Sequence, residues 1–413
     1  MVFVINNDGK PLMPCSNVIA RLLLKQNKAR VERVTPFIIK LLYQLKIVYL
    51  QKLNLGLDSG SRIIGSAVSD IDGNIQYISQ IEVRNDITNR MNRRRNYRQL
   101  RRNRKCRYRK CRFLNRKNSR RKLRFSPTIN SKINTHLREI KFAEKILPIN
   151  DLIIENGTFD LHAIRNPSVL NNPILYQKGL KYGFNNTKAF VLHRDNYRCQ
   201  YCKGKSKDRK LHCHHIIFRE QGGSDNPENL IVLCKTCHLA LHEGKITLKK
   251  SGSRKRGLMH ATQMNIIIKQ LFKRTNAKET FGFITKTHRQ AFNLPKYHFI
   301  DAAVISTKGK QPDFKTDKIL YKKCIPRGDY QQTRGKRSQQ HITTMKICGF
   351  RKYDKVRYNG KNYFIKGRMA IGYAILMDIE GRSQQLKPIP KFIKMKRIIA
   401  RKSWIMTENL ILI

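Results

Sequence analysis

The sequence predicts a multidomain α/β protein, and three observations support that fold class. The 413 residues suffice for two to four domains, and hydrophobic residues make up 40% of them, enough for sizeable cores. Strand-like apolar runs alternate with helix-like patterns along most of the chain. A block rich in cysteine and histidine, at about 185–248, interrupts this alternation. We therefore expect an α/β core with a smaller domain inserted into it.

Positive charge dominates the composition. Lysine and arginine number 86 against 27 aspartate and glutamate residues, which leaves a net charge of +59. A compact chain with this charge repels itself unless a counter-charge is present, and the phosphate backbone of a nucleic acid supplies one. The charge alone also fits a solvated basic surface or a ribosomal-type protein that only binds RNA. The net charge indicates a nucleic-acid partner and gives no information about catalysis.

The sequence shows neither a secretory signal nor a membrane span. The apolar run at Met1–Ile5 is short, and the most hydrophobic segment, 38–50, is interrupted by Lys40 and Lys46. A spanning helix needs about 20 apolar residues. We expect a soluble protein in a reducing compartment, whose ten cysteines are metal ligands or small core residues and not disulfides.

The first half of the chain is predicted to begin with a small basic unit at 1–50 that contains a helix at 18–28. Three strands follow, and Asp72-Gly73-Asn74 is a typical hairpin turn between the second and the third. A helix and a buried strand come after an arginine-rich segment. The predicted strands lie at 53–58, 62–69, 75–83 and 151–155, and the helix lies at 132–147.

The arginine-rich segment runs from 90 to 124, where 19 of 35 residues are arginine or lysine and none is acidic. A helix with charge on all faces does not bury itself in a protein core, whereas guanidinium groups bind phosphates well. We predict a helix that lies on nucleic acid, anchored by interspersed residues such as Tyr97 and Leu100. A disordered basic tail is the alternative. The arginines assigned to nucleic-acid contact are Arg93, Arg94, Arg95, Arg98, Arg101, Arg102, Arg104, Arg107, Arg109 and Arg112.

The α/β pattern continues after the cysteine- and histidine-rich block. Helices are predicted at 263–274 and 298–306, with a strand at 280–284 between them. The segment 311–340 is polar and basic. From 346 to about 382 short strands alternate with turns, which predicts a small β-barrel.

Two cysteine pairs, Cys199-x-x-Cys202 and Cys234-x-x-Cys237, have the spacing of metal-binding hooks. Four thiolates form a closed tetrahedral zinc site, which is structural because no coordination position is left open. The gap between the pairs is longer than in a zinc ribbon, so we expect the zinc to hold a small domain together. A single zinc finger with incidental histidines is the alternative.

Histidines concentrate in and around this gap. Six of the twelve lie between His193 and His242. A divalent cation can bind imidazoles and a phosphate oxygen together, while a neighbouring neutral histidine activates water near neutral pH. Three of them precede an apolar run at 216–218 that is predicted as a strand, and two are spaced to share one helix face. These are His212, His214 and His215, then His238 and His242.

The block resembles the HNH nuclease motif across its length. The resemblance implies a ββα-metal domain in which His215 is the general base and His214 and His238 hold Mg²⁺. His242 is a candidate third ligand, and Asn229 orders the loop. The matching residues are Tyr197-Arg198-Cys199-Gln200-Tyr201-Cys202, His214-His215-Ile216-Ile217, Gly222-Gly223-Ser224-Asp225, Asn229-Leu230 and Cys234 to His238.

Four other residues could form a second site. Asp58 ends a predicted strand beside glycines that leave room for a metal and a phosphate, and Glu155 ends another. His298 and Asp301 share one face of a predicted helix. Each indication is weak alone, because an aspartate such as Asp58 is common in turns, and His298 and Asp301 could simply pair with each other.

Together, these residues resemble the three RuvC motifs of an RNase H-like fold, in the right order and on the right elements. The resemblance implies that Asp58, Glu155 and Asp301 meet to hold two magnesium ions about 4 Å apart. His298 would then lie beside the second ion or the attacking water. Three adjacent carboxylates need cations, which this site would bind.

The order of segments along nearly the whole chain resembles the IscB family of transposon-encoded RNA-guided nucleases, which are related to the type II CRISPR effectors. Pro11-Leu12-Met13-Pro14 matches the family's N-terminal domain, and the arginine-rich segment looks like its bridge helix, although Cys106 and Cys111 are unexpected there. The resemblance implies an N-terminal domain at 1–50, RuvC segments at 51–84, 126–184 and 249–310, a bridge helix at 85–125, an HNH domain at 185–248, a basic RNA-interacting segment at 311–345 and a C-terminal β-rich domain at 346–413.

The activity implied by this resemblance is RNA-guided cleavage of DNA. A structured noncoding guide RNA would pair with one strand of double-stranded target DNA, and the protein would recognise a short flanking motif. HNH would cut the guide-paired strand and RuvC the displaced strand, with Mg²⁺ at both centres and structural Zn²⁺ in HNH. We expect a monomeric protein within a ribonucleoprotein in a prokaryotic cytoplasm, without membrane contact. A stand-alone HNH DNA endonuclease and an inactive RNA-binding protein are the alternatives.

Overall fold

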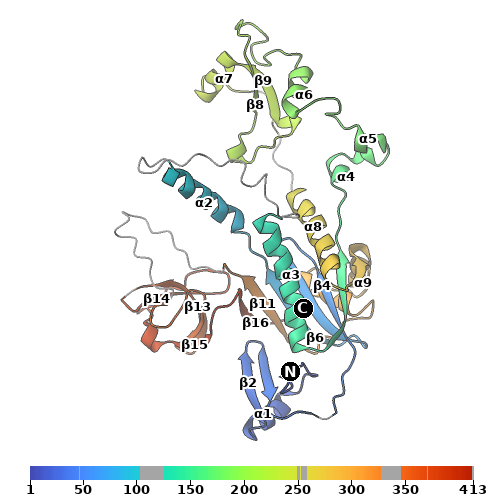
Figure 1. Ribbon diagram of the computed structural model, residues 1–413, viewed down its shortest axis with the longest axis vertical. Coiled ribbons are helices and arrows are strands. Elements are labelled where there is room, and N and C mark those ends of the chain that lie inside the picture. The colour runs from blue at the N-terminus through green and yellow to red at the C-terminus, as the bar shows by residue number, and fades with distance from the viewer. Residues whose placement is uncertain are drawn as a thin grey trace. The chain divides into compact units, whose positions relative to one another are not determined.

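The computed structural model describes residues 1–45, 47–102, 125–248, 252, 258–326, 346–369 and 371–411 (Figure 1). The chain forms two compact units. Unit 1 comprises Met1–Gly157 and Ile266–Ile413, and unit 2, Thr158–Asn265, is inserted between these two parts. Unit 2 contains the whole cysteine- and histidine-rich block. Within the described ranges, no helix is both long enough and apolar enough to cross a membrane.

A seven-stranded mixed sheet forms the centre of unit 1, in the order β10-β7-β4-β5-β6-β11-β16 (Figure 1). Strands β4, β5 and β6 form an antiparallel meander. On one side of it β7 runs parallel to β4 and β10 parallel to β7. On the other side β11 runs parallel to β6, and β16 antiparallel to β11. The bounds are β4 Leu53–Asp58, β5 Ile63–Asp70, β6 Ile75–Glu82, β7 Ile149–Asn156, β10 Lys278–Phe281, β11 Lys318–Cys324 and β16 Trp404–Leu410.

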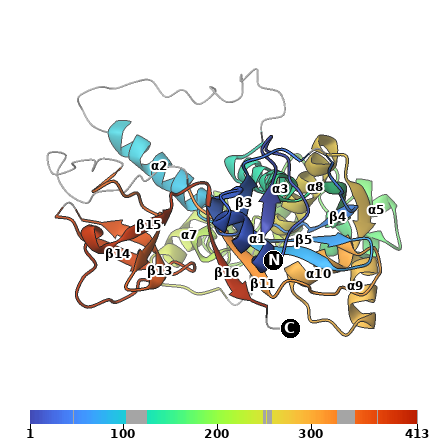
Figure 2. The same ribbon diagram turned by 90° about the horizontal axis from the view of Figure 1, so that it is seen from below.

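Helices α10 (His298–Ser306) and α3 (Pro127–Ile146) pack on opposite faces of this sheet. Figure 2 shows α10 alongside β5. Every residue of β4 is buried, as expected of a central strand that is covered on both sides. Side chains alternate between the faces along a strand. In β5, Ala67 therefore packs with α10, whereas Ser66 points to α3 and hydrogen-bonds Glu139 at 2.6 Å.

Two glycines allow α10 to lie directly on the sheet. A Cβ atom at Gly56 would stand 2.3 Å from the carbonyl oxygen of Ala302, and one at Gly65 would stand 1.8 Å from the carbonyl oxygen of His298. These are backbone atoms, so a side chain at either position would push the helix away. Gly65 pairs with Asp58 in the sheet, and α10 therefore begins directly above the end of β4.

A buried ion pair joins α3 to the opposite face of the sheet. The Lys322 ammonium lies 2.6 Å from the Glu139 carboxylate, and both side chains are fully buried. Burial lowers the pKa of Lys322, whereas the charge and hydrogen bond of Lys322 outweigh burial at Glu139 and lower its pKa. The ammonium also lies 4.0 Å from the ring centroid of Phe142 and 5.0 Å from that of Trp404. The pair is thus enclosed by aromatic rings from α3 and from β16.

The N-terminal part of unit 1 is a three-stranded sheet in the order β1-β3-β2, with helix α1 packed on it. The helix begins after Ser16, whose hydroxyl accepts a hydrogen bond from the backbone N–H of Ile19 and so caps it. The predicted helix at 18–28 is therefore present but three residues shorter at its C-terminal end. The bounds are β1 Phe3–Ile5, α1 Asn17–Lys25, β2 Ala29–Val34 and β3 Phe37–Leu41.

The C-terminal part of unit 1 contains a four-stranded antiparallel sheet in the order β14-β13-β12-β15. Its edge strands β14 and β15 do not pair with each other, so among the described residues the expected β-barrel is an open sheet. Val356, Ile365 and Phe392 contribute to its separate hydrophobic core. The bounds are β12 Lys355–Tyr358, β13 Lys361–Arg368, β14 Ala374–Met377 and β15 Lys396–Ile399.

Three elements of unit 1 differ from the sequence-based expectation. The strand expected at 280–284 ends at Phe281, because helix α9 (Gly282–Ala291) begins there. The segment expected to be polar and basic contains β11, a short strand in which Ile319, Leu320 and Lys322 are buried. Strand β16 leaves the C-terminal part and joins the central sheet beside β11. These three elements are determined by pairing with strands that are distant in sequence. The local sequence pattern contains no information about that pairing.

Unit 2 is built on a two-stranded antiparallel sheet of β8 and β9. Two small hydrophobic clusters line it: one around the cysteine pairs, the other around Val191 and Val232. The strand expected at 216–218 lies earlier, since the histidine-rich run itself pairs with β9 as β8. Helix α8 begins in unit 2 and continues into unit 1. The bounds are α4 Leu161–Arg165, α5 Ile174–Gln177, α6 Thr187–Arg194, β8 Leu211–His215, β9 Leu230–Cys234, α7 Lys235–His242 and α8 Leu258–Arg274.

Substitution Lys322→Met should destabilise unit 1 strongly, because it leaves the Glu139 carboxylate buried without a counter-charge. Loss of one partner of a buried pair costs about 3–5 kcal/mol. Adding Glu139→Gln removes the orphaned charge and should recover more than half of the loss. Chemical denaturation of the single and double variants measures both effects. An additive loss in the double variant would contradict this account of the pair.

Candidate functional sites

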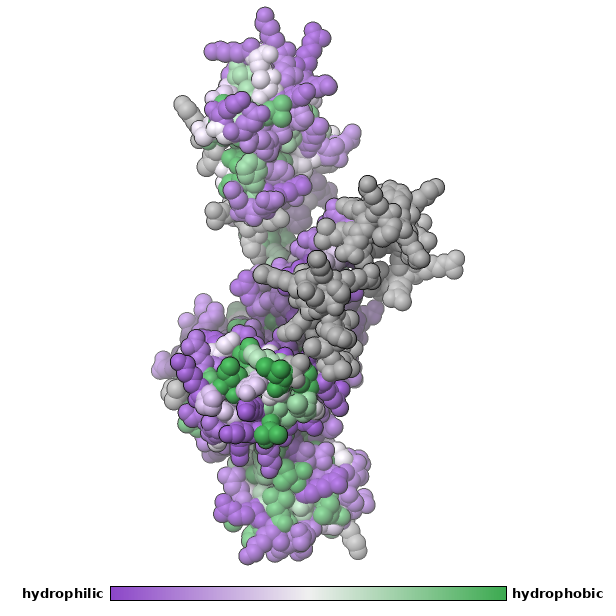
Figure 3. Space-filling model, turned by 90° about the vertical axis from the view of Figure 1, so that its left-hand side faces the viewer, coloured by the Kyte–Doolittle hydropathy of each residue, from purple (hydrophilic) through white to green (hydrophobic). Residues whose placement is uncertain are grey.

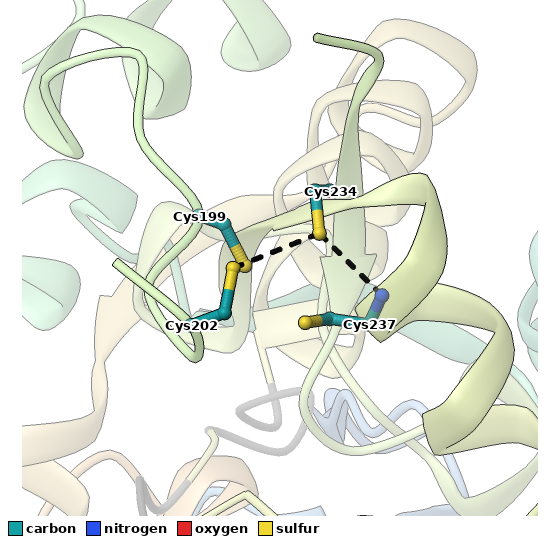
Figure 4. Close-up of side chains that lie close together, drawn as sticks. All are labelled: Cys199, Cys202, Cys234 and Cys237. Atoms are coloured by element: carbon teal, nitrogen blue, oxygen red, sulfur yellow. Dashed lines mark hydrogen bonds between the residues drawn. The ribbon is translucent and has the colours of Figure 1, made fainter. Parts of the chain in front are cut away.

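Four cysteines converge at one end of unit 2, as the sequence predicts. The Sγ atoms of Cys199, Cys202, Cys234 and Cys237 lie within 4.8 Å of one another, and Figure 4 shows the side chains pointing toward a common centre. The Cys202 and Cys234 sulfurs are 3.8 Å apart. Cys234 ends β9 and caps helix α7, where its sulfur accepts the backbone N–H of Cys237 at 3.5 Å.

The donor set fits zinc. Four sulfurs with one pair at a turn and the other at a helix start are a structural zinc arrangement. Burial opposes ionisation of Cys202, but hydrogen bonds from Ser206 and from backbone N–H groups lower its pKa to about 6. Burial and hydrogen bonds among the thiols raise the pKa of Cys237. Thiols this close share protons, because neighbouring thiolates would repel one another. A divalent cation bound by the thiolates relieves that repulsion.

Three histidines of unit 2 form a second cluster, and two of them project from α7. Ligand nitrogens of His214, His238 and His242 lie within 4.8 Å of one another. His214 is buried in β8, and its Nε2 has no hydrogen-bond partner among the described residues. Burial, followed by the neighbouring His238 and His242, lowers the pKa of His214 to about 4. A neutral imidazole with an unpaired buried nitrogen is suited to a metal ion, so the set fits a divalent cation.

His215 stands apart from this cluster and faces Asp225. Its Nε2 lies 2.9 Å from the Asp225 carboxylate, which also accepts a hydrogen bond from Arg219 at 2.8 Å. These two hydrogen bonds lower the pKa of Asp225. Asp225 and Arg219 were not assigned roles at His215 from the sequence. The adjacent His212 stacks on His238 with ring centroids 4.9 Å apart.

Asn229 fastens the loop that carries Asp225. Its side chain is fully buried. The amide oxygen accepts the backbone N–H of Ile217 at 2.9 Å, and the amide nitrogen donates to the carbonyl oxygens of Ile217 at 3.0 Å and Ser224 at 2.8 Å. One amide group thus closes the loop between β8 and β9, and it fixes the side chain of Asp225 opposite His215.

In unit 1, the sheet and α10 bring Asp58, Glu155, His298 and Asp301 into one cluster, hereafter the carboxylate cluster. Asp58 ends β4 and Glu155 lies near the end of the parallel strand β7, so both side chains leave the sheet at the same edge. Helix α10 begins above them, and His298 Nδ1 lies 2.6 Å from Asp58 Oδ2. The alternative in which His298 pairs with Asp301 is therefore wrong.

Mutual repulsion marks the carboxylate cluster. Burial, followed by the charge of Asp58, raises the pKa of Glu155 to about 7. The same two causes raise the pKa of Asp301. The hydrogen bond to Asp58 raises the pKa of His298. Carboxylates that repel one another offer the oxygen ligands that hard divalent cations prefer, so the carboxylate cluster is a candidate Mg²⁺ site.

Helix α9 supplies residues that the sequence did not identify, because this segment was expected to be partly a strand. The Arg289 Nε lies 2.8 Å from Asp301 Oδ1, and both side chains are nearly buried. Neither atom has hydrogen-bond geometry, so the contact is electrostatic. Gly282 faces Glu155, since a Cβ there would stand 2.9 Å from Glu155 Oε1. Thr285 lowers the pKa of Glu155 and so partly offsets its rise.

The arginine-rich segment begins as helix α2 (Ile87–Arg102). Four of its arginines are exposed, and Tyr97 is half-buried among them. In the face shown in Figure 3, hydrophilic residues cover most of the described surface. The side chains of Arg101 and Arg102 lie outside the described residues, as do Arg104, Arg107, Arg109 and Arg112 and the two cysteines Cys106 and Cys111. The exposed set is Arg93, Arg94, Arg95 and Arg98.

Two family models match this chain. The model described as RRXRR protein matches residues 2–179, and the model described as HNH endonuclease matches residues 199–244. Between them they cover the first two segments of the carboxylate cluster, the arginine-rich helix and both clusters of unit 2. The chain is an IscB-like protein with an HNH endonuclease domain. Its four-cysteine site lies within that domain.

Other similarities cover parts of this IscB-like protein. Anaredoxin from Nostoc sp. (strain PCC 7120 / SAG 25.82 / UTEX 2576) is 31% identical over 58 residues, which are 14% of this chain and 74% of anaredoxin. Streptococcus thermophilus Cas9 in complex with the AGAA PAM aligns over 61% of this chain and 32% of its own, at 10% identity and a TM-score of 0.33. The complex with the GGAA PAM gives 12% identity and the same TM-score of 0.33, over 62% and 32% of the two chains. The IscB-like chain thus spans about a third of the length of these Cas9 chains.

Purified IscB-like protein should contain about one zinc ion per chain, and Cys237→Ser should abolish it and lower the unfolding temperature of the HNH domain. Plasma emission spectrometry and thermal denaturation measure the two effects. Cys213→Ser is the matched control, since Cys213 is a half-buried thiol of the same unit outside the four-cysteine cluster. Undiminished zinc in Cys237→Ser would remove this cysteine from the ligand set.

Proposed function

We propose that this IscB-like protein is an RNA-guided DNA endonuclease with two hydrolytic centres. The observation that carries the proposal is the presence, in one chain, of a histidine centre in the HNH domain and a carboxylate cluster on a separate mixed sheet. One centre suffices to cut one strand. Two centres of different chemistry in one very basic chain suit a substrate whose two strands are presented separately.

At the HNH centre, we assign His215 as the general base. In the proposed hydrolysis a water molecule attacks phosphorus, the bond to the leaving sugar oxygen breaks, and His215 takes the proton of the water. The Asp225 carboxylate accepts a hydrogen bond from Nε2, which leaves Nδ1 of the neutral ring as the proton acceptor. Arg219 holds Asp225 from the other side.

His214, His238 and His242 would hold the divalent cation of this centre. When bound, that cation stabilises negative charge on the phosphate and on the leaving oxygen. The low pKa of His214 keeps its imidazole neutral, and therefore able to bind a cation, at any pH at which the protein would work. Zinc bound by the four cysteines would fix the start of α7, the helix from which His238 and His242 project.

At the second centre, Asp58, Glu155 and Asp301 would hold Mg²⁺ in a RuvC-type arrangement and supply the same electrostatic stabilisation. His298 is a proton donor to Asp58 Oδ2 and lies where it can orient or exchange a proton with water at the cluster. Arg289 holds Asp301 through an electrostatic contact at 2.8 Å. Gly282 leaves room for the Glu155 carboxylate, because a Cβ atom there would stand 2.9 Å from Oε1.

Guide RNA is the partner that best accounts for the charge. The net charge of +59 needs a large polyanion, and α2 presents arginines on several exposed faces. Recognition of sequence would be delegated to base pairing, while the protein contacts backbone and a short flanking motif. Double-stranded DNA is the proposed substrate.

The two centres are tested by substituting one residue in each. In protein purified with its co-expressed RNA, Asp58→Ala should abolish cutting of the displaced strand, and His215→Ala cutting of the guide-paired strand. Each loss should be roughly a hundredfold or more, as expected for removal of a catalytic acid–base or metal-binding group. Strand-specific end labels on a target duplex measure both rates, and each variant serves as the control for the other.

Cutting that ignores both substitutions would contradict the proposal. Sequencing of the co-purified RNA decides the partner. A discrete structured RNA with a variable end supports guidance, whereas magnesium-dependent cutting that survives RNase supports a stand-alone HNH nuclease.

Gly282→Ala should weaken the RuvC-type centre selectively. The new Cβ would displace the Glu155 carboxylate from a position only 2.9 Å away, so the Mg²⁺ concentration for half-maximal cutting of the displaced strand should rise roughly tenfold. Cutting of the guide-paired strand should not change. Gly179→Ala is the control, because its Cβ would meet only the carbonyl oxygen of Leu175 at 3.7 Å. An unaltered Mg²⁺ dependence would show that Gly282 does not position Glu155.

A further inference from the structure

Two exposed phenylalanines stand beside the carboxylate cluster. Phe281, the last residue of β10, is 42% exposed, and Phe283, in the first turn of α9, is 70% exposed. Their rings lie nearly parallel, with centroids 6.0 Å apart and planes at 16°. Exposed apolar area carries an unfavourable hydration free energy that burial recovers, so two large rings exposed side by side suit a partner that covers them.

The two rings flank the residue that touches the site. Gly282 lies between them in sequence and faces the Glu155 carboxylate. A Cβ atom at Gly282 would stand 2.9 Å from Glu155 Oε1. The Thr285 hydroxyl, which lowers the pKa of Glu155, donates a hydrogen bond to the carbonyl oxygen of Phe281 at 3.4 Å. The aromatic pair and a proposed Mg²⁺ ligand are therefore held by the same turn of backbone.

Two exposed lysines on α9 and just before α10 suit a phosphate backbone. Lys286 and Lys296 are exposed on α9 and on the segment before α10. The charge of Lys296 reaches the carboxylate cluster, since it lowers the pKa of Asp301. Alternating aromatic faces and cations are how proteins bind single-stranded nucleic acid, whose bases stack on rings while lysines follow the backbone.

We infer that Phe281 and Phe283 form a stacking platform for the bases of single-stranded DNA that enters the carboxylate cluster. The inference rests on the proposed function and deepens it by naming the state of the substrate strand. In duplex DNA the faces of the bases are already stacked on one another, so only an unpaired strand can use the rings. The platform makes the RuvC-type centre selective for the displaced strand and sets which phosphate reaches Glu155.

The parallel orientation of the rings favours bases over a protein partner. Every base has a flat face, so stacking tolerates any sequence, as a guided nuclease requires. A covering protein segment needs no parallel pair of rings, and a branched aliphatic side chain would serve it as well. The substitution Phe283→Leu distinguishes a stacked base from a protein partner, because leucine keeps apolar area but has no planar face.

The test uses the ribonucleoprotein with Asp58→Ala, which leaves the displaced strand intact, and 5-iodo-2′-deoxyuridine placed along that strand. Irradiation should crosslink one or two positions to the peptide containing Phe281 and Phe283, identified by mass spectrometry. Phe283→Ala should reduce the crosslink roughly five- to hundredfold, the range expected for loss of one stacked base. Phe283→Trp should preserve it, and Phe283→Leu should not.

A cutting assay gives the second readout. In protein with Asp58 intact, Phe283→Ala should slow displaced-strand cutting and spread its position, with guide-paired cutting unchanged. Ile71→Ala is the matched control, since Ile71 is 57% exposed in the turn after β5, at the opposite end of the strand from the residue paired with Asp58.

Displaced-strand cutting and crosslinking that are unaltered in Phe283→Ala, or restored by leucine, would overturn the platform. Absence of any guided cutting by the unsubstituted complex would contradict the proposed function itself.

Discussion

The contact between α10 and two glycines of the central sheet is the constraint on which the carboxylate cluster depends. Gly56 and Gly65 leave the helix backbone in contact with β4 and β5, closer than any side chain allows. Only at that distance does His298 reach Asp58. The parallel pairing of β7 with β4 then brings Glu155 to the same edge. Backbone packing, and not proximity in sequence, assembles the site.

The two centres are stabilised by different means. The carboxylate cluster rests on a large sheet with a buried core, whereas the histidine centre rests on two short strands and an eight-residue helix. A domain of this size buries too little apolar surface to fix a helix, and metal ligation compensates. Cys234 and Cys237 stand at the start of α7, so the thiols that would bind zinc also hold the helix that carries His238 and His242. Integrity of the zinc site and geometry of the histidines are therefore coupled.

Much of this arrangement could be predicted from the sequence wherever a short motif contains residues of specific chemical function. Paired cysteines predicted the four-sulfur cluster, and apolar runs predicted β4 and α10. Contacts between distant segments could not be predicted, because no local sequence pattern indicates which segments meet. Arg289 meets Asp301 across two helices, one of which was expected to be partly a strand. Asp225 meets His215 only after Asn229 closes the loop between them.

Strand β16 (Trp404–Leu410) completes a sheet whose first strand begins at Leu53. On the ribosome, unit 1 stays incomplete until residue 410 emerges, whereas unit 2 has both its strands by Cys234. The roughly 300 residues between α2 and β16 take about 15–60 s to synthesise. During that time the arginines of α2 are already available, while Lys322 still lacks the ring of Trp404 above it. Under the proposed function, guide RNA therefore has access to α2 before the core of unit 1 is complete, so assembly of the proposed complex can begin during translation.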